Sequence, residues 1–182
     1  MVVLGLLGLP ALATLLALIT LFLLKFFSDP PREVIRGEGI MLAPADGRVV
    51  EAGEGRLAIF MSLFDCHVNR APVGGEVVDV VHIPGKFHPA DNPQAKENER
   101  NIITFRTKNG DIRMIQVAGF IARRILCWVK PQDQVEQGER IGMIIFGSRV
   151  ELELPQDRWG FVVALGDKVR AGETIVAKEI NQ

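Results

Sequence analysis

Apolar residues are arranged in two different ways along the chain. The first 24 residues carry no charged side chain and are mostly leucine and other apolar residues. A helix of that length rises about 36 Å, which exceeds the roughly 30 Å hydrocarbon core of a bilayer. From residue 38 onwards, short apolar or alternating runs are separated by Gly, Pro, Asn and Asp, as in a protein of strands and turns. The pattern therefore predicts an N-terminal membrane helix, 1–27, a linker, 28–37, and a mainly β domain, 38–182.

Two other interpretations of the N-terminal run are a buried helix of a soluble protein and a cleaved signal peptide. An uncharged run of this length is unusual for a buried helix. A signal peptide needs a basic segment before the run and small residues at its cleavage site, whereas this run ends in Leu-Leu-Lys-Phe-Phe at 23–27. The sequence favours a retained anchor. Lys25, Arg32 and Arg36 follow the run and no Lys or Arg precedes it, so the positive-inside rule places the β domain on the cytoplasmic side of the cell membrane.

The clearest local signal in the β domain is a hairpin over residues 102–117. Alternating runs flank Asn109-Gly110, and both turn residues tolerate a positive φ. The sequence therefore predicts a turn at Asn109-Gly110, with Lys108 facing Asp111. Three further strands and one long polar loop are expected, the strands at 47–52, 57–63 and 77–83 and the loop at 88–100.

A weak internal repeat bears on how these strands are arranged. Asp-x-Val-x-x-Gly-Glu-x-Ile at 133–141 recurs 34 residues later, at 167–175. This pattern resembles the strand-turn-strand unit of biotinyl and lipoyl carrier domains, although two ordinary Gly-Glu turns would give the same residues. It favours a compact, pseudo-symmetric β-barrel or sandwich. The Met-Lys-Met or similar hairpin that carries the modified lysine of such carriers is not present in the sequence.

Neither the net charge nor the spacing of possible metal ligands indicates a function. Lys and Arg number 21 and Asp and Glu 22, so the net charge of −1 gives no signal for nucleic-acid binding. Cys66 and Cys127 lie far apart, which leaves two buried thiols or a single bridge open. The three histidines, His67, His82 and His88, lack the spacing of a zinc site, so no metal is expected.

The dipeptide with the most chemical potential is Gly147-Ser148, where an apolar strand runs into an alternating one. Glycine permits backbone conformations that other residues disfavour. A hydroxyl beside a strained peptide carbonyl can in principle attack it. Taken alone, however, Gly-Ser is most often a β-bulge or a tight bend. Its meaning depends on the rest of the chain.

Several segments around this dipeptide form a specific pattern. In chain order they are Ala-Pro-Ala-Asp-Gly-Arg-Val at 43–49, Phe-Asp-Cys-His-Val-Asn-Arg-Ala-Pro at 64–72, Glu-Asn-Glu-Arg-Asn at 97–101 and Ile-Ala-Arg-Arg-Ile at 121–125. They are followed by Gly-Glu-Arg-Ile-Gly at 138–142 and Phe-Gly-Ser-Arg-Val at 146–150. In this order they resemble the phosphatidylserine decarboxylases, in particular their short, pyruvoyl-dependent form. The resemblance covers most of the chain after residue 40.

The resemblance implies a cofactor made from the chain itself. Loss of CO2 from an amino acid leaves a carbanion that needs a carbonyl sink, and no fingerprint of pyridoxal phosphate is visible. In the family, the serine at the position of Ser148 attacks the preceding carbonyl, here that of Gly147, and becomes a pyruvoyl group. Self-cleavage would then give a β chain, 1–147, and an α chain, 148–182. The substrate amine would form a Schiff base with the pyruvoyl ketone.

The same resemblance assigns the base and its partner. A serine nucleophile needs a base that is best held by a carboxylate, and the matching positions are His67 and Asp46. Alone, His67 reads as a half-buried structural histidine, and Asp46-Gly47 as a turn. Some family members carry a second histidine three residues on, where this chain has Arg70. Whether His67 serves both self-cleavage and decarboxylation therefore stays open.

The implied reaction converts phosphatidylserine to phosphatidylethanolamine and CO2, and the anchor suits a substrate in membrane lipid. A phosphodiester favours nearby cations, and Arg70 and Arg149 are candidates, with Arg123 and Arg124 also available. A glycerol-ether lipid with a serine headgroup would fit equally well. A homo-oligomer is compatible with the sequence. The alternative function is a non-catalytic, membrane-anchored β-barrel that binds a partner and does not need Asp46, His67 and Ser148 together.

Overall fold

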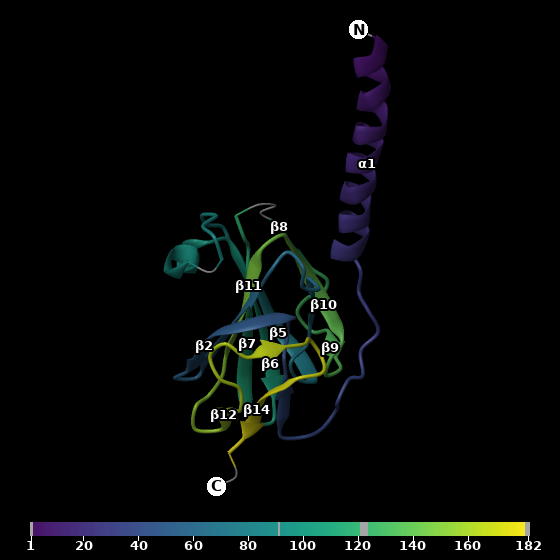
Figure 1. Cartoon of the computed structure of the whole chain (residues 1–182). Coiled ribbons are helices and arrows are strands. Elements are labelled where there is room, and N and C mark those ends of the chain that lie inside the picture. Colours follow the sequence, from purple (N-terminus) through teal and green to yellow (C-terminus); the bar gives the residue numbers. More distant parts are fainter. Residues whose placement is uncertain (1, 91, 121–123, 181–182) are drawn as a thin grey trace.

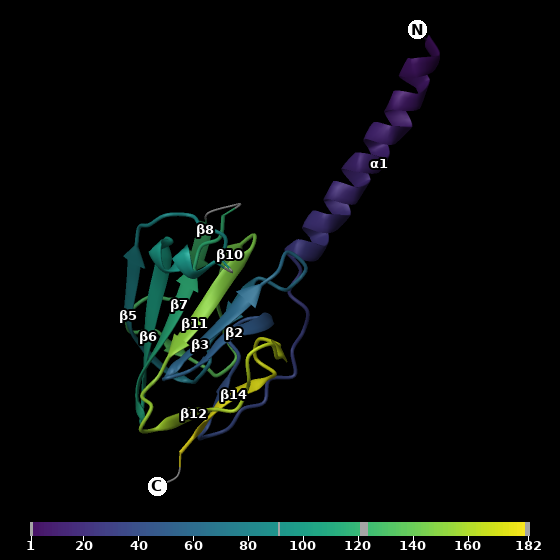
Figure 2. The same cartoon turned by 60° about the vertical axis from the view of Figure 1, so that its left-hand side comes forward.

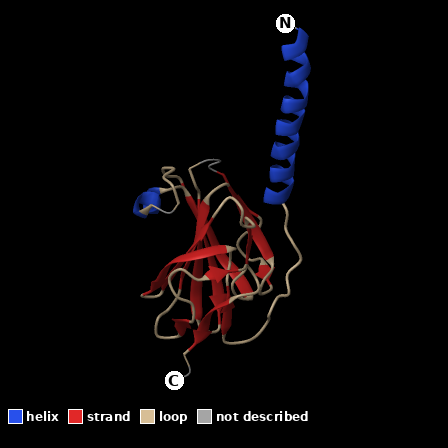
Figure 3. Cartoon of the chain, viewed as in Figure 1, coloured by secondary structure: helices blue, strands red, loops and turns tan. Residues whose placement is uncertain are grey.

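The computed structural model describes residues 2–90, 92–120 and 124–180. One long helix, α1 (Val2–Phe26), projects from a mainly β domain, and the two chain termini lie at opposite ends of the molecule (Figure 1). Among the described residues, the only other helix is η1 (Pro93–Glu97), a short 3-10 turn in the region expected as a polar loop (Figure 3). The predicted fold class, mainly β with an apolar N-terminal helix, is thus confirmed.

Helix α1 is apolar along its length and scarcely touches the β domain. Its segment Leu9–Phe26 has a mean hydropathy of 2.2 and is 6% buried, so it is long and apolar enough to cross a membrane. Leucine side chains along Leu9–Phe26 are exposed, and Leu24 is 67% exposed. Such a surface is unfavourable in water and favourable in lipid, so this helix indicates membrane association.

The β domain contains three antiparallel sheets. The largest has the order β13-β2-β3-β11-β7-β6-β5-β9 and consists of β2 (Gly47–Gly53), β3 (Arg56–Met61), β5 (Gly75–Ile83), β6 (Arg100–Thr107), β7 (Gly110–Val117), β9 (Gln134–Val135), β11 (Ser148–Glu153) and β13 (Lys168–Val169). Two three-stranded sheets complete the domain. They are β1 (Ile40–Leu42), β14 (Ile175–Glu179) and β12 (Trp159–Phe161), and β4 (Val68–Arg70), β10 (Arg140–Ile145) and β8 (Arg124–Cys127).

The three sheets share one hydrophobic core. Met41 from β1, Ile103 from β6 and Ile144 from β10 are fully buried in the same cluster. Alternation along β6 places Ile103 and Phe105 inward, as expected for a strand with one face on a core. The strands expected at 47–52, 57–63 and 77–83 correspond to β2, β3 and β5.

The internal repeat extends further than its sequence pattern. The segments that pair with the two copies, 43–49 and 71–77, share Ala-Pro-x-x-Gly-x-Val. Three backbone hydrogen bonds recur at equivalent positions in the two copies. In the first copy they are Val77 N to Asp133 O (2.9 Å), Gln132 N to Val77 O (2.7 Å) and Gly138 N to Ala71 O (2.9 Å). In the second copy they are Val49 N to Asp167 O (2.9 Å), Gly166 N to Val49 O (2.9 Å) and Gly172 N to Ala43 O (3.0 Å). The two halves of the domain therefore repeat one arrangement of strand and turn.

The hairpin is present, but its turn lies one residue earlier than predicted. Thr107 pairs with Gly110, so Lys108-Asn109 forms the tip, and Asp111 faces Arg106 instead of Lys108. Thr107 Oγ1 accepts from Asn109 N (3.1 Å) and donates to Gly110 O (2.7 Å), which tightens the turn at this place. Only the glycine of the Asn-Gly pair takes a positive φ, of 100°.

The linker is fixed to the β domain by ion pairs. Asp29 accepts from Arg70 (2.9 Å) and also pairs with Arg140, while Arg32 pairs with Asp46 (2.8 Å). The Asp29–Arg70 and Arg32–Asp46 pairs are partly buried, so they are less screened by solvent than surface pairs. The linker therefore holds the end of α1 at one position on the β domain.

Candidate active site

The peptide expected to be cut lies in a strained corner between two sheets. Strand β10 ends at Ile145 and β11 begins at Ser148, so Phe146 and Gly147 make the connection. Both take left-handed conformations, with φ of 54° for Phe146 and 61° for Gly147. For a bulky residue such as Phe146 this conformation costs on the order of 1–3 kcal/mol and persists only where the surroundings enforce it. Strain thus lies next to Ser148.

Ser148 itself is fully buried, and its hydroxyl is weakly held. It pairs with Met61 across β3 and β11, and its Oγ donates to Met61 Sδ over 3.4 Å. Thioether sulfur is a weak acceptor, so this contact does little to stop the hydroxyl from turning toward another partner. A second donor, Asn69 Nδ2, lies 3.8 Å from the same sulfur, and Asn69 Oδ1 accepts from Gln116 Nε2 (2.8 Å). Met61 therefore lies between Ser148 and the buried amide of Asn69, which in turn holds Gln116.

His67 has the protonation state of a base. Its Nδ1 lies 2.8 Å from the Asp65 carbonyl oxygen. A carbonyl only accepts hydrogen bonds, so Nδ1 carries the proton and Nε2 presents its lone pair. Nε2 is buried and has no hydrogen-bond partner among the described residues. Burial lowers the pKa of His67, and the nearby charges of Asp65 and Asp46 offset that effect only in part. The ring is thus neutral near pH 7.

One aromatic ring connects His67 with the segment that precedes Ser148. The Phe26 ring centroid lies 4.3 Å from that of His67 and 4.2 Å from that of Phe146. Ile144 N, two residues before Phe146, also donates to the His67 carbonyl (3.3 Å). Figure 2 shows the end of α1 beside the β domain, on the side away from the C-terminus. His67 and the corner at Phe146 therefore lie together under the end of the apolar helix.

Asp46 is engaged by other groups. Its Oδ2 accepts from Arg32 (2.8 Å) and its Oδ1 from Ala171 N (2.8 Å). Within the described part of the chain, the structure gives no hydrogen bond between Asp46 and His67 or between His67 and Ser148. A backbone carbonyl, that of Asp65, occupies the orienting position that the family resemblance assigns to a carboxylate.

The arginine candidates for phosphate binding already have anionic partners. Arg70 pairs with Asp29 (2.9 Å), and its other amino group donates to the Gly138 carbonyl (3.0 Å). Arg149 lies between Glu51 (3.0 Å) and Glu151 (2.8 Å). Arg124 begins the exposed end of β8, whereas Arg123 is outside the described residues.

Four residues at the site were missed by sequence reasoning: Phe26, Met61, Asn69 and Gln116. Asn69 and Gln116 had a signal, because each is a polar residue within a strand whose neighbouring positions are buried. Phe26 had none, since one phenylalanine in an apolar run looks like any other. Met61 closes a strand of apolar residues and is recognisable only from its contact with Ser148.

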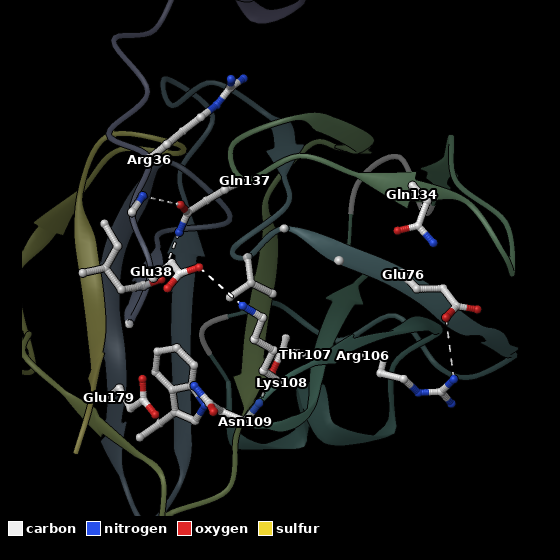
Figure 4. A pocket seen from close by; sticks show the side chains of 17 residues that line it. Arg36, Glu38, Glu76, Arg106, Thr107, Lys108, Asn109, Gln134, Gln137 and Glu179 are labelled. Carbon is white, nitrogen blue, oxygen red and sulfur yellow. Dashed lines mark hydrogen bonds and ion pairs between the residues drawn. The ribbon is translucent and has the colours of Figure 1, made fainter. Parts of the chain in front are cut away.

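A large cavity lies elsewhere in the described part of the structure. It has a volume of about 1020 Å³ and lies beside the tip of the β6–β7 hairpin (Figure 4). Ser148 lies near Val117, at the other end of β7, and eight residues of strand place the two ends about 23 Å apart. Charges that line the cavity pair with one another, Glu38 with Lys108 (3.5 Å) and Glu76 with Arg106 (3.6 Å). The cavity is therefore separate from the Ser148 corner.

Comparison with known proteins gives consistent matches. A sequence model of the family described as phosphatidylserine decarboxylase matches residues 52–177. A phosphatidylserine decarboxylase proenzyme of Desulfotalea psychrophila is 45% identical over 176 residues, which cover 90% of this chain and 82% of the relative. One of Nitrosomonas europaea is 44% identical over 173 residues, with 88% and 80% covered. A protein of Methanosarcina mazei, provisionally named archaetidylserine decarboxylase proenzyme, is 43% identical over 159 residues, with 87% and 76% covered.

Proposed function

The chain belongs to the phosphatidylserine decarboxylase family, and from that premise we propose how its own residues make and use the reactive group. The family reaction removes the carboxylate of a serine headgroup as CO2 and leaves an ethanolamine headgroup. The observation that carries the proposal is the corner at Ser148. A buried serine follows two left-handed residues, and a neutral histidine with a free Nε2 lies against the same aromatic ring as that corner.

Self-cleavage begins at the Gly147 carbonyl. Ser148 Oγ attacks the carbonyl carbon, its proton passes to the departing amide nitrogen by way of His67 Nε2, and an ester replaces the peptide bond. A base then removes the Ser148 α-proton, and the Gly147 carboxylate leaves as dehydroalanine forms. Water adds to the tautomeric imine, ammonia departs, and residue 148 becomes a ketone-bearing N-terminus. The products are the chains 1–147 and 148–182.

The surroundings of Ser148 fit a small, uncharged ketone, because the residue is fully buried against the uncharged Met61 side chain, which also contacts the Asn69 amide. A ketone at residue 148 would supply a carbonyl for the substrate amine and a sink for the electron pair released with CO2. The protein's part is to keep water out and to supply protons. Phe26 covers His67 and Phe146, so it shields both from solvent.

The roles of the charged residues follow from their contacts. Asp46 supports the site through Arg32 and the backbone of Ala171, and its charge acts on His67 without a hydrogen bond. Arg70 or Arg149 can hold the substrate phosphate only if the phosphate displaces Asp29 or Glu51.

The substrate is a membrane lipid with a serine headgroup, on an ester-linked or an ether-linked glycerol. The relatives named for phosphatidylserine and for archaetidylserine support this scope. Helix α1 anchors the protein in the cell membrane, and Lys25, Arg32 and Arg36 favour a β domain on the cytoplasmic face. The repeated strand-turn units support a pseudo-symmetric, barrel-like or sandwich-like β domain of the carrier type, and assembly into a homo-oligomer is compatible with it.

Intact-mass measurement of the purified full-length chain in detergent tests the proposal. Two fragments that divide between Gly147 and Ser148 are expected, and the C-terminal one should be lighter by one ammonia than a fragment with N-terminal serine. A single species of 20.1 kDa in protein that is folded and fully incubated would instead favour the non-catalytic binding module.

A further inference from the structure

Gly119 lies so close to the bond proposed for cleavage that it has no room for a side chain. A Cβ on Gly119 would overlap the Gly147 carbonyl oxygen and lie 2.6 Å from the Gly147 carbonyl carbon and 2.7 Å from the Phe146 carbonyl oxygen. Its φ lies outside the left-handed range, so an L-residue could adopt this backbone conformation. The glycine is therefore needed for close approach to residues 146 and 147 and not for its own dihedral angles.

We infer that the backbone of Gly119 is part of the self-cleavage site, where it holds the Gly147 carbonyl in the position that Ser148 attacks. This rests on the proposed function, because it assumes that the Gly147–Ser148 bond is cut. Phe146 relaxes from its left-handed conformation unless neighbouring atoms prevent it, and Gly147 is free to take other conformations. Gly119 approaches the carbonyl oxygens of both residues, so it supplies that constraint.

A buried asparagine holds Gly119 in turn. Asn98 Nδ2 donates to the carbonyl of Ala118, the residue before Gly119, over 2.9 Å. Ala118 N donates to the Glu99 carbonyl (2.9 Å), so the peptide of Ala118 is tied on both sides to residues 98 and 99. The same Asn98 amide also donates to His88 O (2.8 Å) and accepts from His88 N (2.7 Å). Asn98 is 1% exposed, and both polar atoms of its side chain are used.

This chain of contacts gives the segment 97–101 a function. The sequence singled out its Glu-Asn-Glu-Arg-Asn pattern, but none of its residues lies among those that carry the proposed chemistry. Asn98 acts through Ala118 and Gly119 on the Gly147 carbonyl, and is therefore a positioning residue for self-cleavage. Substitution of Asn98 should therefore slow self-cleavage, although Ser148 and His67 are themselves unchanged.

The test is a time course of self-cleavage in the full-length chain carrying Gly119→Ala. The added methyl displaces the Gly147 carbonyl, so the cleavage rate should fall at least tenfold. Gly160→Ala is the matched control, because a Cβ there lies 3.6 Å from the nearest atom, on Ile180, and again needs no left-handed φ. It should cleave at the rate of the unaltered protein. Cleavage of Gly119→Ala within twofold of that rate would overturn the inference.

A second variant covers the case in which Gly119→Ala folds poorly. Asn98→Asp keeps an acceptor for His88 N but loses the donor to Ala118 O and His88 O. Cleavage should slow at least fivefold among molecules that remain folded by circular dichroism. If both variants lose cleavage only in proportion to their unfolded fraction, the residues are merely structural and the inference is wrong.

Hydroxylamine locates the affected step. It attacks an ester carbonyl much faster than an amide, giving a hydroxamate at Gly147 and a free serine at 148. Gly119→Ala should contain no ester of this kind, because the carbonyl is displaced before Ser148 attacks. An accumulated ester in this variant would contradict the assigned role. If the unaltered protein itself stays whole and ester-free, the proposed self-cleavage fails, which is a different outcome from normal cleavage in Gly119→Ala.

Discussion

The ring of Phe26, at the last position of α1, lies 4.3 Å from the ring of His67, measured between centroids. The apolar helix therefore has a role in addition to the proposed membrane attachment, because its last turn covers the candidate base. Phe26 is 2% exposed, whereas its neighbour Phe27 is 51% exposed. The ion pair between Asp29 and Arg70 holds this end of the helix in place. Anchor and site are thus physically joined.

Phe26→Ala should change the pH dependence of self-cleavage. Removal of the ring lets water reach His67 and weakens the burial that lowers its pKa. The acid limb of the rate profile should move to higher pH, toward the ordinary histidine value. Leu24→Ala is the control, since Leu24 is 67% exposed on the same helix and should leave the profile unchanged. If the pH–rate profile of Phe26→Ala is unshifted, a group other than His67 determines its acid limb.

The unaltered protein should keep its cleavage activity below pH 6.5, the ordinary pKa of histidine, because burial lowers the pKa of His67. The unfolded chain takes up a proton at this ring as pH falls through 6.5, and the folded chain does so only at lower pH. The stability that this difference provides is complete above pH 6.5 and declines as pH falls toward the pKa of His67 in the folded protein.

His67→Gln should abolish cleavage at every pH. Measurable cleavage with a normal acid limb in that variant would remove His67 as the base.

Asp46→Asn should act through stability first. The substitution keeps an acceptor for Ala171 N but takes the Asp46 carboxylate from the Arg32 guanidinium, whose side chain is 5% exposed and whose other carboxylate, Glu173, lies 3.9 Å away. The free energy of unfolding should fall by about 1–3 kcal/mol. Combining it with Arg32→Met should recover part of the loss, since the unpaired charge is then gone. Denaturant titration of the four proteins measures the coupling, and additive losses would contradict a direct Arg32–Asp46 pair.

Truncation should separate anchoring from catalysis. Deletion of residues 1–24 removes most of the apolar surface but keeps Phe26, so the remaining domain should be soluble and should still cleave itself. Deletion of 1–27 also removes Phe26 and should slow cleavage. Protease protection of the full-length protein in vesicles of known orientation checks the cytoplasmic placement. Equal rates in the two truncations would show that Phe26 is dispensable.

Local patterns in the sequence predicted what depends on local physics. The uncharged N-terminal run, the alternation of β6 and β7 and the Gly-Glu turns of the repeat are all visible along the chain. The hairpin turn was displaced by one residue because the Thr107 hydroxyl bonds across the turn, a contact that the Asn-Gly rule does not include.

The contacts missed at the site depend on residues far apart in sequence. Phe26 meets His67 only because the linker is held by Asp29, and Gly119 meets Gly147 only because β7 and β11 are neighbours. Asp46 was assigned as the partner of His67 by family resemblance, and the structure directs its two oxygens to Arg32 and Ala171. Which carboxylate oxygen meets which donor is decided by packing and has no signature in the motif itself.

Conversion of Ser148 into the reactive group is the central claim, and Ser148→Ala tests it most directly. Alanine has no hydroxyl, so no ester can form and no ketone can arise. CO2 release from vesicles containing serine-headgroup lipid should be followed beside a denaturing gel, with Ser28→Ala as the control, because the Ser28 hydroxyl donates to Lys25 O (2.7 Å) at the exposed end of α1. Ser148→Ala is expected to stay whole and to release no CO2, while Ser28→Ala divides into two chains and is active. An intact Ser148→Ala protein that still releases CO2 would contradict the central claim.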